Sequence, residues 1–157
     1  MVERTDPART GVKAGRVVGL LTAVFAVISL IRVQGSYYEN VATVFTLLGI
    51  ESQFSVTVLF WGNVLLTASA RYVIGYVVGS LIGVLYDWLD RPSLLILIGI
   101  VFVVGAVDGL LAAIDTRSIG IGCAYAIAWL CYVPVFAWLF EDDAGTVEKG
   151  PLRLGDL

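Results

Sequence analysis

Asp108 is the residue with the clearest capacity for chemistry, because it is the single charge in the apolar run 93–114. A charge at depth in a membrane costs at least about 2.5–3.5 kcal/mol, so it should face protein or water and have a partner. Arg71 would enter from the same side of the membrane at a similar depth. We therefore predict an Arg71–Asp108 ion pair. It would be a structural link between helices or an ion or proton site; a solvated Asp108 that reaches the membrane surface is the third interpretation.

Glu51 and Asn63 are the other polar candidates, and both lie in the segment 41–66. If this segment rests at the membrane surface, water solvates both side chains. If it crosses the membrane, Glu51 becomes a second intramembrane carboxylate, and this would favour a transport function. The candidate intramembrane polar site therefore consists of Asp108, Arg71, Glu51 and Asn63.

Enzymatic chemistry is not expected. The chain has no histidine, no glycine-rich phosphate loop with lysine and no metal-ligand spacing. Tyr86-Asp87 followed by the run from Gly105 to Asp108 resembles the paired motifs of intramembrane aspartyl proteases, but Val107 stands where that pattern needs glycine. The two aspartates would also differ in depth by about 24 Å, too far to share a proton. We predict no catalytic residue, no metal and no cofactor.

Glycine recurs at every fourth residue in the uncharged stretch 72–86. On a helix this spacing makes a groove without side chains, which lets a second helix approach closely. In water each interior glycine would cost about 1 kcal/mol against alanine. We expect the next span, 93–114, to fill the groove; a pore or a lipid groove is the alternative. The glycines predicted to pack helices are Gly75, Gly79, Gly83, Gly105 and Gly109.

The composition predicts a membrane protein. Of 157 residues, 59% are hydrophobic and 15% are charged, whereas soluble domains are about 45–50% apolar and about 25% charged. The excess cannot be buried in one small core, so lipid must surround much of it. The net charge is −3, without a basic patch of the nucleic-acid type. The expected partners are the lipid bilayer and either other membrane subunits or further copies of the chain, with no nucleic acid.

Apolar runs predict an all-α, polytopic membrane bundle of four transmembrane helices, with five as the alternative. A polar basic tail, 1–15, precedes the membrane domain 16–140, and an acidic polar tail, 141–157, follows it. Pro134 is expected to kink the last span. The predicted spans are 16–33, 67–89, 93–114 and 118–140.

The segment 41–66 has three interpretations. We predict a pair of short helices, interfacial or re-entrant, outside the membrane after a polar turn at 34–40. A fifth span over 44–66 is the second interpretation. A single long tilted helix over 54–89 is the third.

The positions of arginine and lysine predict the orientation. With four spans, seven of them lie inside and three outside; with five spans the division is six against four. The rule favours four spans with both ends of the chain in the cytoplasm. We therefore expect a multi-pass protein of the cell membrane with a cytoplasmic N-terminus.

Two functions remain open at this point. The absence of a catalytic pattern, together with many small-residue contacts, favours a small structural or accessory membrane subunit. The alternative is a small oligomeric channel or transporter that uses Asp108 and Arg71 as its intramembrane polar site.

Overall fold

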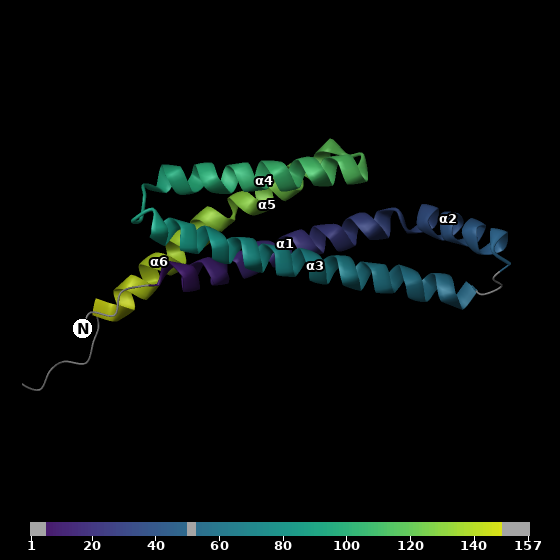
Figure 1. The fold of residues 1–157 in the computed structure, drawn as a ribbon, viewed down its shortest axis with the longest axis horizontal. Helices are drawn as coiled ribbons and strands as arrows, with labels where there is room; N and C mark the ends of the chain where they lie inside the picture. The colour runs from purple at the N-terminus through teal and green to yellow at the C-terminus, as the bar shows by residue number, and fades with distance from the viewer. Residues whose placement is uncertain (1–5, 50–52, 149–157) are drawn as a thin grey trace, which may run out of the picture.

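The structure, a computed structural model, describes residues 6–49 and 53–148, with side chains over 6–49 and 56–140. These residues form a bundle of α-helices without strands (Figure 1). Four segments are long and apolar enough to cross a membrane: Pro7–Arg32, Val56–Trp88, Leu94–Thr116 and Ile119–Phe140. The predicted all-α class is confirmed, and the chain is a multi-pass membrane protein. The helices are α1 (Pro7–Arg32), α2 (Gln34–Leu47), α3 (Gln53–Trp88), α4 (Leu94–Thr116), α5 (Ile119–Leu130) and α6 (Tyr132–Glu148).

Helix α1 begins well before the predicted span, at Pro7 rather than at residue 16. The Asp6 carboxylate caps it by accepting a hydrogen bond of 3.0 Å from the backbone N–H of Ala8. Proline suits the first helical position because its missing N–H would have no partner there. Residues 7–15 of the predicted polar tail therefore form the first part of α1, where Ala14 is 0% exposed; residues 1–5 lie outside the described part of the chain.

The glycine groove of α3 is filled by α1, not by the span that follows it as predicted. A Cβ atom on Gly79 would lie 2.3 Å from the Cα atom of Gly15, and one on Gly75 would lie 2.3 Å from the Cα atom of Gly19. The two backbones therefore touch directly. The reason is that α1 carries glycines at the same spacing, so the two grooves interlock. The glycines of this contact on α1 are Gly11, Gly15 and Gly19.

Helix α3 is continuous where two elements were predicted. It begins at Gln53 and ends at Trp88, and it matches the long-helix interpretation of 54–89. The run contains no proline to stop it. The predicted polar turn at 34–40 lies within α2, and the predicted outer segment 41–66 is divided between α2 and α3.

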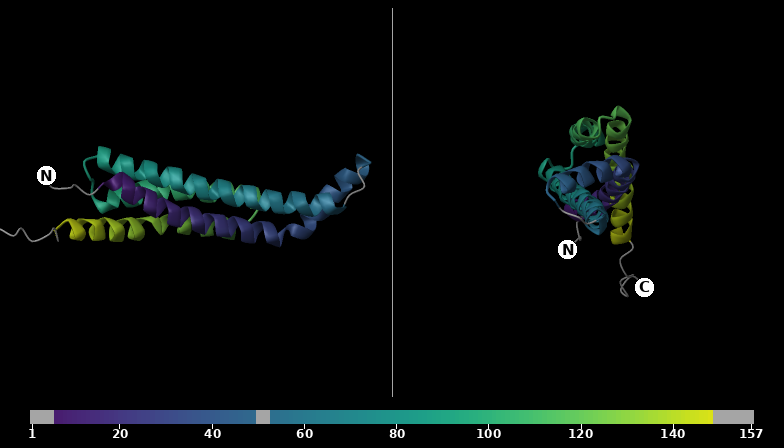
Figure 2. Two further views of the ribbon diagram at one scale, coloured as in Figure 1. Left: turned by 90° about the horizontal axis from the view of Figure 1, so that it is seen from below. Right: turned by 90° about the vertical axis from the view of Figure 1, so that its right-hand side faces the viewer.

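A projecting hairpin extends beyond the bundle at one end (Figures 1 and 2). It consists of α2 and residues 53–66 of α3. The 36 residues of α3 extend about 54 Å, whereas the hydrocarbon core of a bilayer is about 30 Å thick. The hairpin lies past the turn between α4 and α5, while the start of α1 and the end of α6 lie at the opposite end of the bundle.

The last predicted span is divided into α5 and α6 at Cys131. Pro134 has no N–H to donate to the carbonyl of Leu130, so the helix loses a hydrogen bond at this point. The interruption of the helix agrees with the kink predicted at Pro134. Helix α6 continues to Glu148, which places 141–148 of the predicted acidic tail in a helix; residues 149–157 lie outside the described part.

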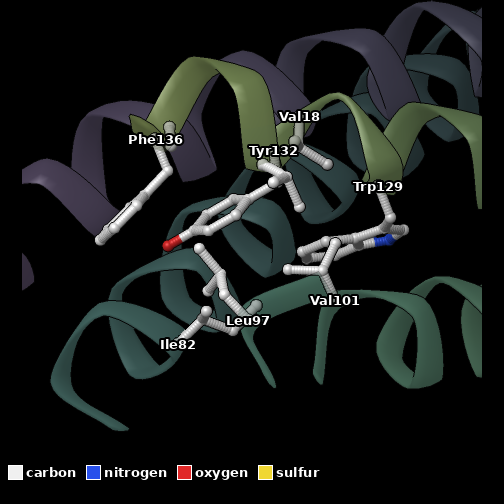
Figure 3. Close-up of a cluster of buried hydrophobic side chains, with 9 residues drawn as sticks. Val18, Ile82, Leu97, Val101, Trp129, Tyr132 and Phe136 are labelled. Atoms are coloured by element: carbon white, nitrogen blue, oxygen red, sulfur yellow. The ribbon is translucent and has the colours of Figure 1, made fainter. Parts of the chain in front are cut away.

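A buried apolar cluster joins two pairs of closely packed helices, α1 with α3 and α4 with α5 (Figure 3). The Tyr132 hydroxyl is buried in it and donates a hydrogen bond of 2.8 Å to the backbone carbonyl of Gly79. The tyrosine therefore links α6 to the glycine contact. The labelled side chains are Val18, Ile82, Leu97, Val101, Trp129, Tyr132 and Phe136.

Candidate functional site

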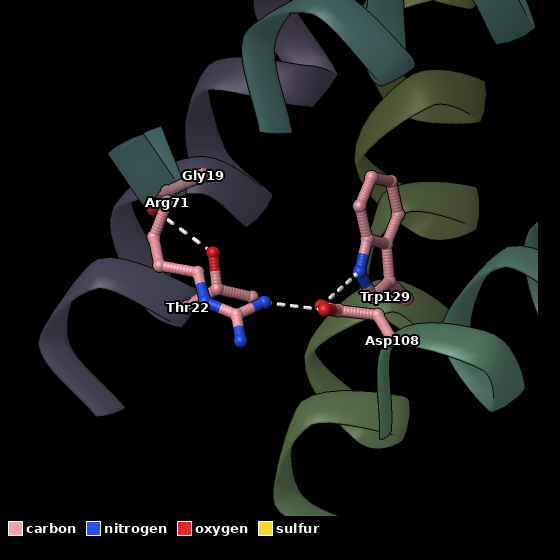
Figure 4. A network of polar contacts seen from close by, with 5 residues as sticks. All are labelled: Gly19, Thr22, Arg71, Asp108 and Trp129. Carbon is pink, nitrogen blue, oxygen red and sulfur yellow. Dashed lines mark hydrogen bonds and ion pairs between the residues drawn. The ribbon is translucent and has the colours of Figure 1, made fainter. Parts of the chain in front are cut away.

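Arg71 and Asp108 are in direct contact, as predicted (Figure 4). The Nη1 group of Arg71 on α3 donates a hydrogen bond to Oδ1 of Asp108 on α4. The two side chains are 22% and 16% exposed, respectively. The guanidinium and the carboxylate thus compensate each other where water has limited access.

The second carboxylate oxygen of Asp108 also has a donor. The indole Nε1–H of Trp129 on α5 donates to Oδ2 at 2.9 Å (Figure 4). Gly105 makes room for this indole, because a Cβ atom there would lie 2.8 Å from Cβ of Trp129. One carboxylate therefore connects three helices.

Tyr125 holds the other side of the guanidinium. Its ring centroid lies 4.7 Å from Cζ of Arg71, which is within the range of a cation–π contact. The same ring packs on Phe25 of α1 with a centroid distance of 6.1 Å. Thr22 of α1 lies beside this network in Figure 4 and donates to its own helix, to the Gly19 carbonyl at 3.1 Å.

Two of the four predicted polar residues meet, and a third does not join them. Asn63 lies on α3, half-buried, about 12 Å along the axis from Arg71 by the rise per residue. Helical geometry thus keeps its amide away from the ion pair. Glu51 lies outside the described residues. Gly109, predicted to pack a helix, does so against α5, because a Cβ atom there would lie 2.6 Å from the carbonyl oxygen of Gly122.

A cavity of about 540 Å³ lies next to the ion pair, where α1 and α4 end and α5 begins. Arg71 lines it together with Arg32 from the end of α1 and Arg117 from the turn after α4. Asp115 and Ser118 are also at its wall. The cavity therefore gathers several charged side chains around an otherwise largely apolar space.

Sequence reasoning missed three parts of this arrangement. Trp129 and Tyr125 could not be placed beside Asp108 and Arg71, because the rotation of α5 about its axis follows from packing. The cavity arises from four separate helices. The glycines of α1 had a recognisable pattern, since 11, 15 and 19 repeat the spacing of 75, 79 and 83.

Two further findings bear on function. Among the residues described, no group of three or more histidine, cysteine, aspartate or glutamate side chains could hold a metal ion. Comparison with protein families, curated proteins and solved structures finds no match to this chain.

Proposed function

We propose that this protein is a non-catalytic component of the cell membrane, a small structural or accessory subunit with its N-terminus in the cytoplasm. The observation that carries the proposal is the closed network around Asp108. Both carboxylate oxygens accept hydrogen bonds from other helices, and the guanidinium also stacks on Tyr125. A carboxylate with both oxygens paired in this way is suited to fixing helices rather than to exchanging ions or protons.

The projecting hairpin supports a role in assembly. Its apolar side chains are exposed at a level beyond the turn between α4 and α5, for example Leu47 at 81% and Leu65 at 70%. Apolar surface of this kind in a membrane protein is typical of contacts with lipid or with another subunit. In an accessory subunit the hairpin would contact the partner subunit at the membrane surface.

Reconstitution into liposomes tests the proposal. We expect the purified protein to show the same ion and solute flux as empty liposomes. We also expect the Asp108→Asn variant to lose thermal stability without any change in flux. Saturable, ion-specific flux that Asp108→Asn abolishes while the fold persists would overturn the structural role.

Quantitative crosslinking in native membranes tests the accessory role. We expect one membrane partner at a fixed ratio, crosslinked through residues of the projecting hairpin. Crosslinks to many unrelated proteins, in proportion to their abundance, would contradict it. A cysteine at Val103, which is 61% exposed on α4, provides a lipid-facing control position.

A small oligomeric channel or transporter is the second candidate. The observation in its favour is the cavity of about 540 Å³, because Arg71 of the ion pair lines it. The liposome experiment separates the two functions, since only a transporter gives flux that depends on Asp108.

A further inference from the structure

We infer that the cavity at the end of α1 is a binding site for a phosphate ester. Three arginines from separate elements line it: Arg32, Arg71 and Arg117. Guanidinium groups match phosphate oxygens with paired N–H donors, and several of them around one space favour this anion. The site shares Arg71 with the ion pair, but the proposed structural role requires no ligand.

The charge balance of the cavity favours an anion. Arg71 is compensated by Asp108, which leaves Arg32 and Arg117 against Asp115 among the lining side chains. The wall thus carries one net positive charge. Side chains of like charge around one cavity repel each other, and a bound anion relieves that repulsion.

The start of α5 adds backbone donors. Ser118 is the N-cap of α5 and lines the cavity, and its side chain makes no capping hydrogen bond to the helix. The first N–H groups of a helix have no partner within it and carry partial positive charge. Here they accompany arginine side chains in one cavity, which a bare helix end would lack.

The size and the apolar wall indicate an ester rather than a free small ion. A volume of about 540 Å³ is far larger than one phosphate group needs. Ala26, Leu30 and Ile121 line the cavity beside the arginines, so the phosphate would carry an organic group. A lipid headgroup and a water-soluble ester share this chemistry, and both can be tested directly.

The location of the cavity between the two helix pairs means that a bound ligand would affect how the pairs are held together. Arg32 belongs to the α1–α3 pair and lies at the junction with α2, whereas Arg117 follows α4 in the α4–α5 pair. A phosphate between them would connect the two helix pairs at the root of the projecting hairpin. The bound state should therefore unfold at a higher temperature than the free state.

Binding to the full-length protein tests the inference with two probes. Glycerol 3-phosphate is titrated in detergent against sodium chloride of equal ionic strength, with thermal unfolding as the readout. Phosphatidylglycerol and phosphatidylcholine are compared in native mass spectrometry as retained lipids. We expect a saturable rise in melting temperature with the ester, preferential retention of phosphatidylglycerol, or both. The first outcome identifies a soluble ester and the second a lipid headgroup.

Three variants locate the site. Arg32→Gln and Arg117→Gln should each weaken binding by about tenfold or more, because each removes a charge-assisted pair. Arg9→Gln makes the same change at an exposed residue near the other end of α1 and should bind as the native chain does. Binding that is equal in all four proteins, or no binding of either probe, would overturn the inference.

A variant expected to bind the phosphate ester more tightly keeps the test valid even if an arginine variant unfolds. Asp115 is exposed at the cavity wall, and Asp115→Asn removes the carboxylate that repels an anion. We expect affinity to rise by about fivefold, which corresponds to about 1 kcal/mol of binding free energy. An unchanged or lower affinity would contradict a phosphate in this cavity.

Discussion

Asp108 shows how a membrane bundle accommodates a carboxylate at depth. The Coulomb attraction to Arg71 offsets the loss of hydration, and the indole of Trp129 occupies the remaining oxygen. Removing one partner from such a pair costs more than removing both, because the survivor keeps its charge without compensation.

The Asp108→Asn variant should therefore lose about 2–3 kcal/mol in the free energy of unfolding. This loss is somewhat smaller than for a fully buried pair, because both side chains keep some exposure. The double variant Arg71→Met with Asp108→Asn should recover part of this loss. Denaturant unfolding in detergent measures these two variants and the Arg71→Met single variant. A double variant that loses the sum of the two single effects would show that the charges do not interact.

Trp129→Phe tests the second donor alone. The change keeps most of the apolar surface of the side chain. It removes the N–H group that donates a hydrogen bond to Asp108. We expect a loss of about 1–2 kcal/mol in the free energy of unfolding, because a carboxylate oxygen is left without its partner. Trp138→Phe is the matched control, since Trp138 is 65% exposed. Equal effects of the two substitutions would argue against the hydrogen bond.

The helices are held in two pairs by contacts between backbones. Gly15 on α1 and Gly79 on α3 leave no room for a Cβ atom, so dispersion contacts between the main chains replace side-chain packing. The same principle applies to Gly109 and Gly122 between α4 and α5. Repeated glycine spacing therefore selects which helices form a pair.

Gly79→Ala should separate α1 from α3, because the new methyl group would meet the Cα atom of Gly15 at 2.3 Å. Overpacking of this kind costs about 1–3 kcal/mol or more when the neighbour is backbone. Gly62→Ala on the same helix is the control, since nothing lies within 4 Å of its Cβ position, and it should stabilise the helix by up to about 1 kcal/mol. Thermal unfolding distinguishes the two; equal melting temperatures would contradict the interlocked contact.

The two ends of the molecule along its long axis are built from different elements. The start of α1, the turn between α3 and α4, and α6 lie at one end, and the projecting hairpin lies at the other (Figure 2). Because the 36 residues of α3 are longer than a bilayer is thick, part of α3 must lie outside the hydrocarbon core, and we expect this part to be the projecting hairpin.

Cysteine labelling checks this arrangement in a background with Cys123 and Cys131 replaced by alanine. Ser93→Cys, in the turn between α3 and α4, should react with an impermeant maleimide in inside-out vesicles. Thr43→Cys, exposed on α2, should react in right-side-out vesicles if the N-terminus is in the cytoplasm, as we propose from the positions of arginine and lysine. Labelling of both positions from one side would refute the four-span topology.

The sequence by itself determined the class of protein, the favoured number of four apolar spans, the interruption near Pro134 and the ion pair. These features depend on local chemistry: the composition, the length of each apolar run, and the one charge in each of two spans. They can therefore be identified from the sequence without knowing how the helices pack. The pair Arg71–Asp108 was predictable because the cost of an unpaired charge in lipid leaves few alternatives.

Only the tertiary structure decided which helix fills the groove of α3 and which side chains complete the site. Many helices could enter a groove without side chains, and the choice of α1 depends on matching two glycine patterns at once. The placement of Trp129, Tyr125 and the arginines of the cavity depends on how each helix is rotated about its axis. That rotation is set by packing among all the helices together, and no single segment specifies it.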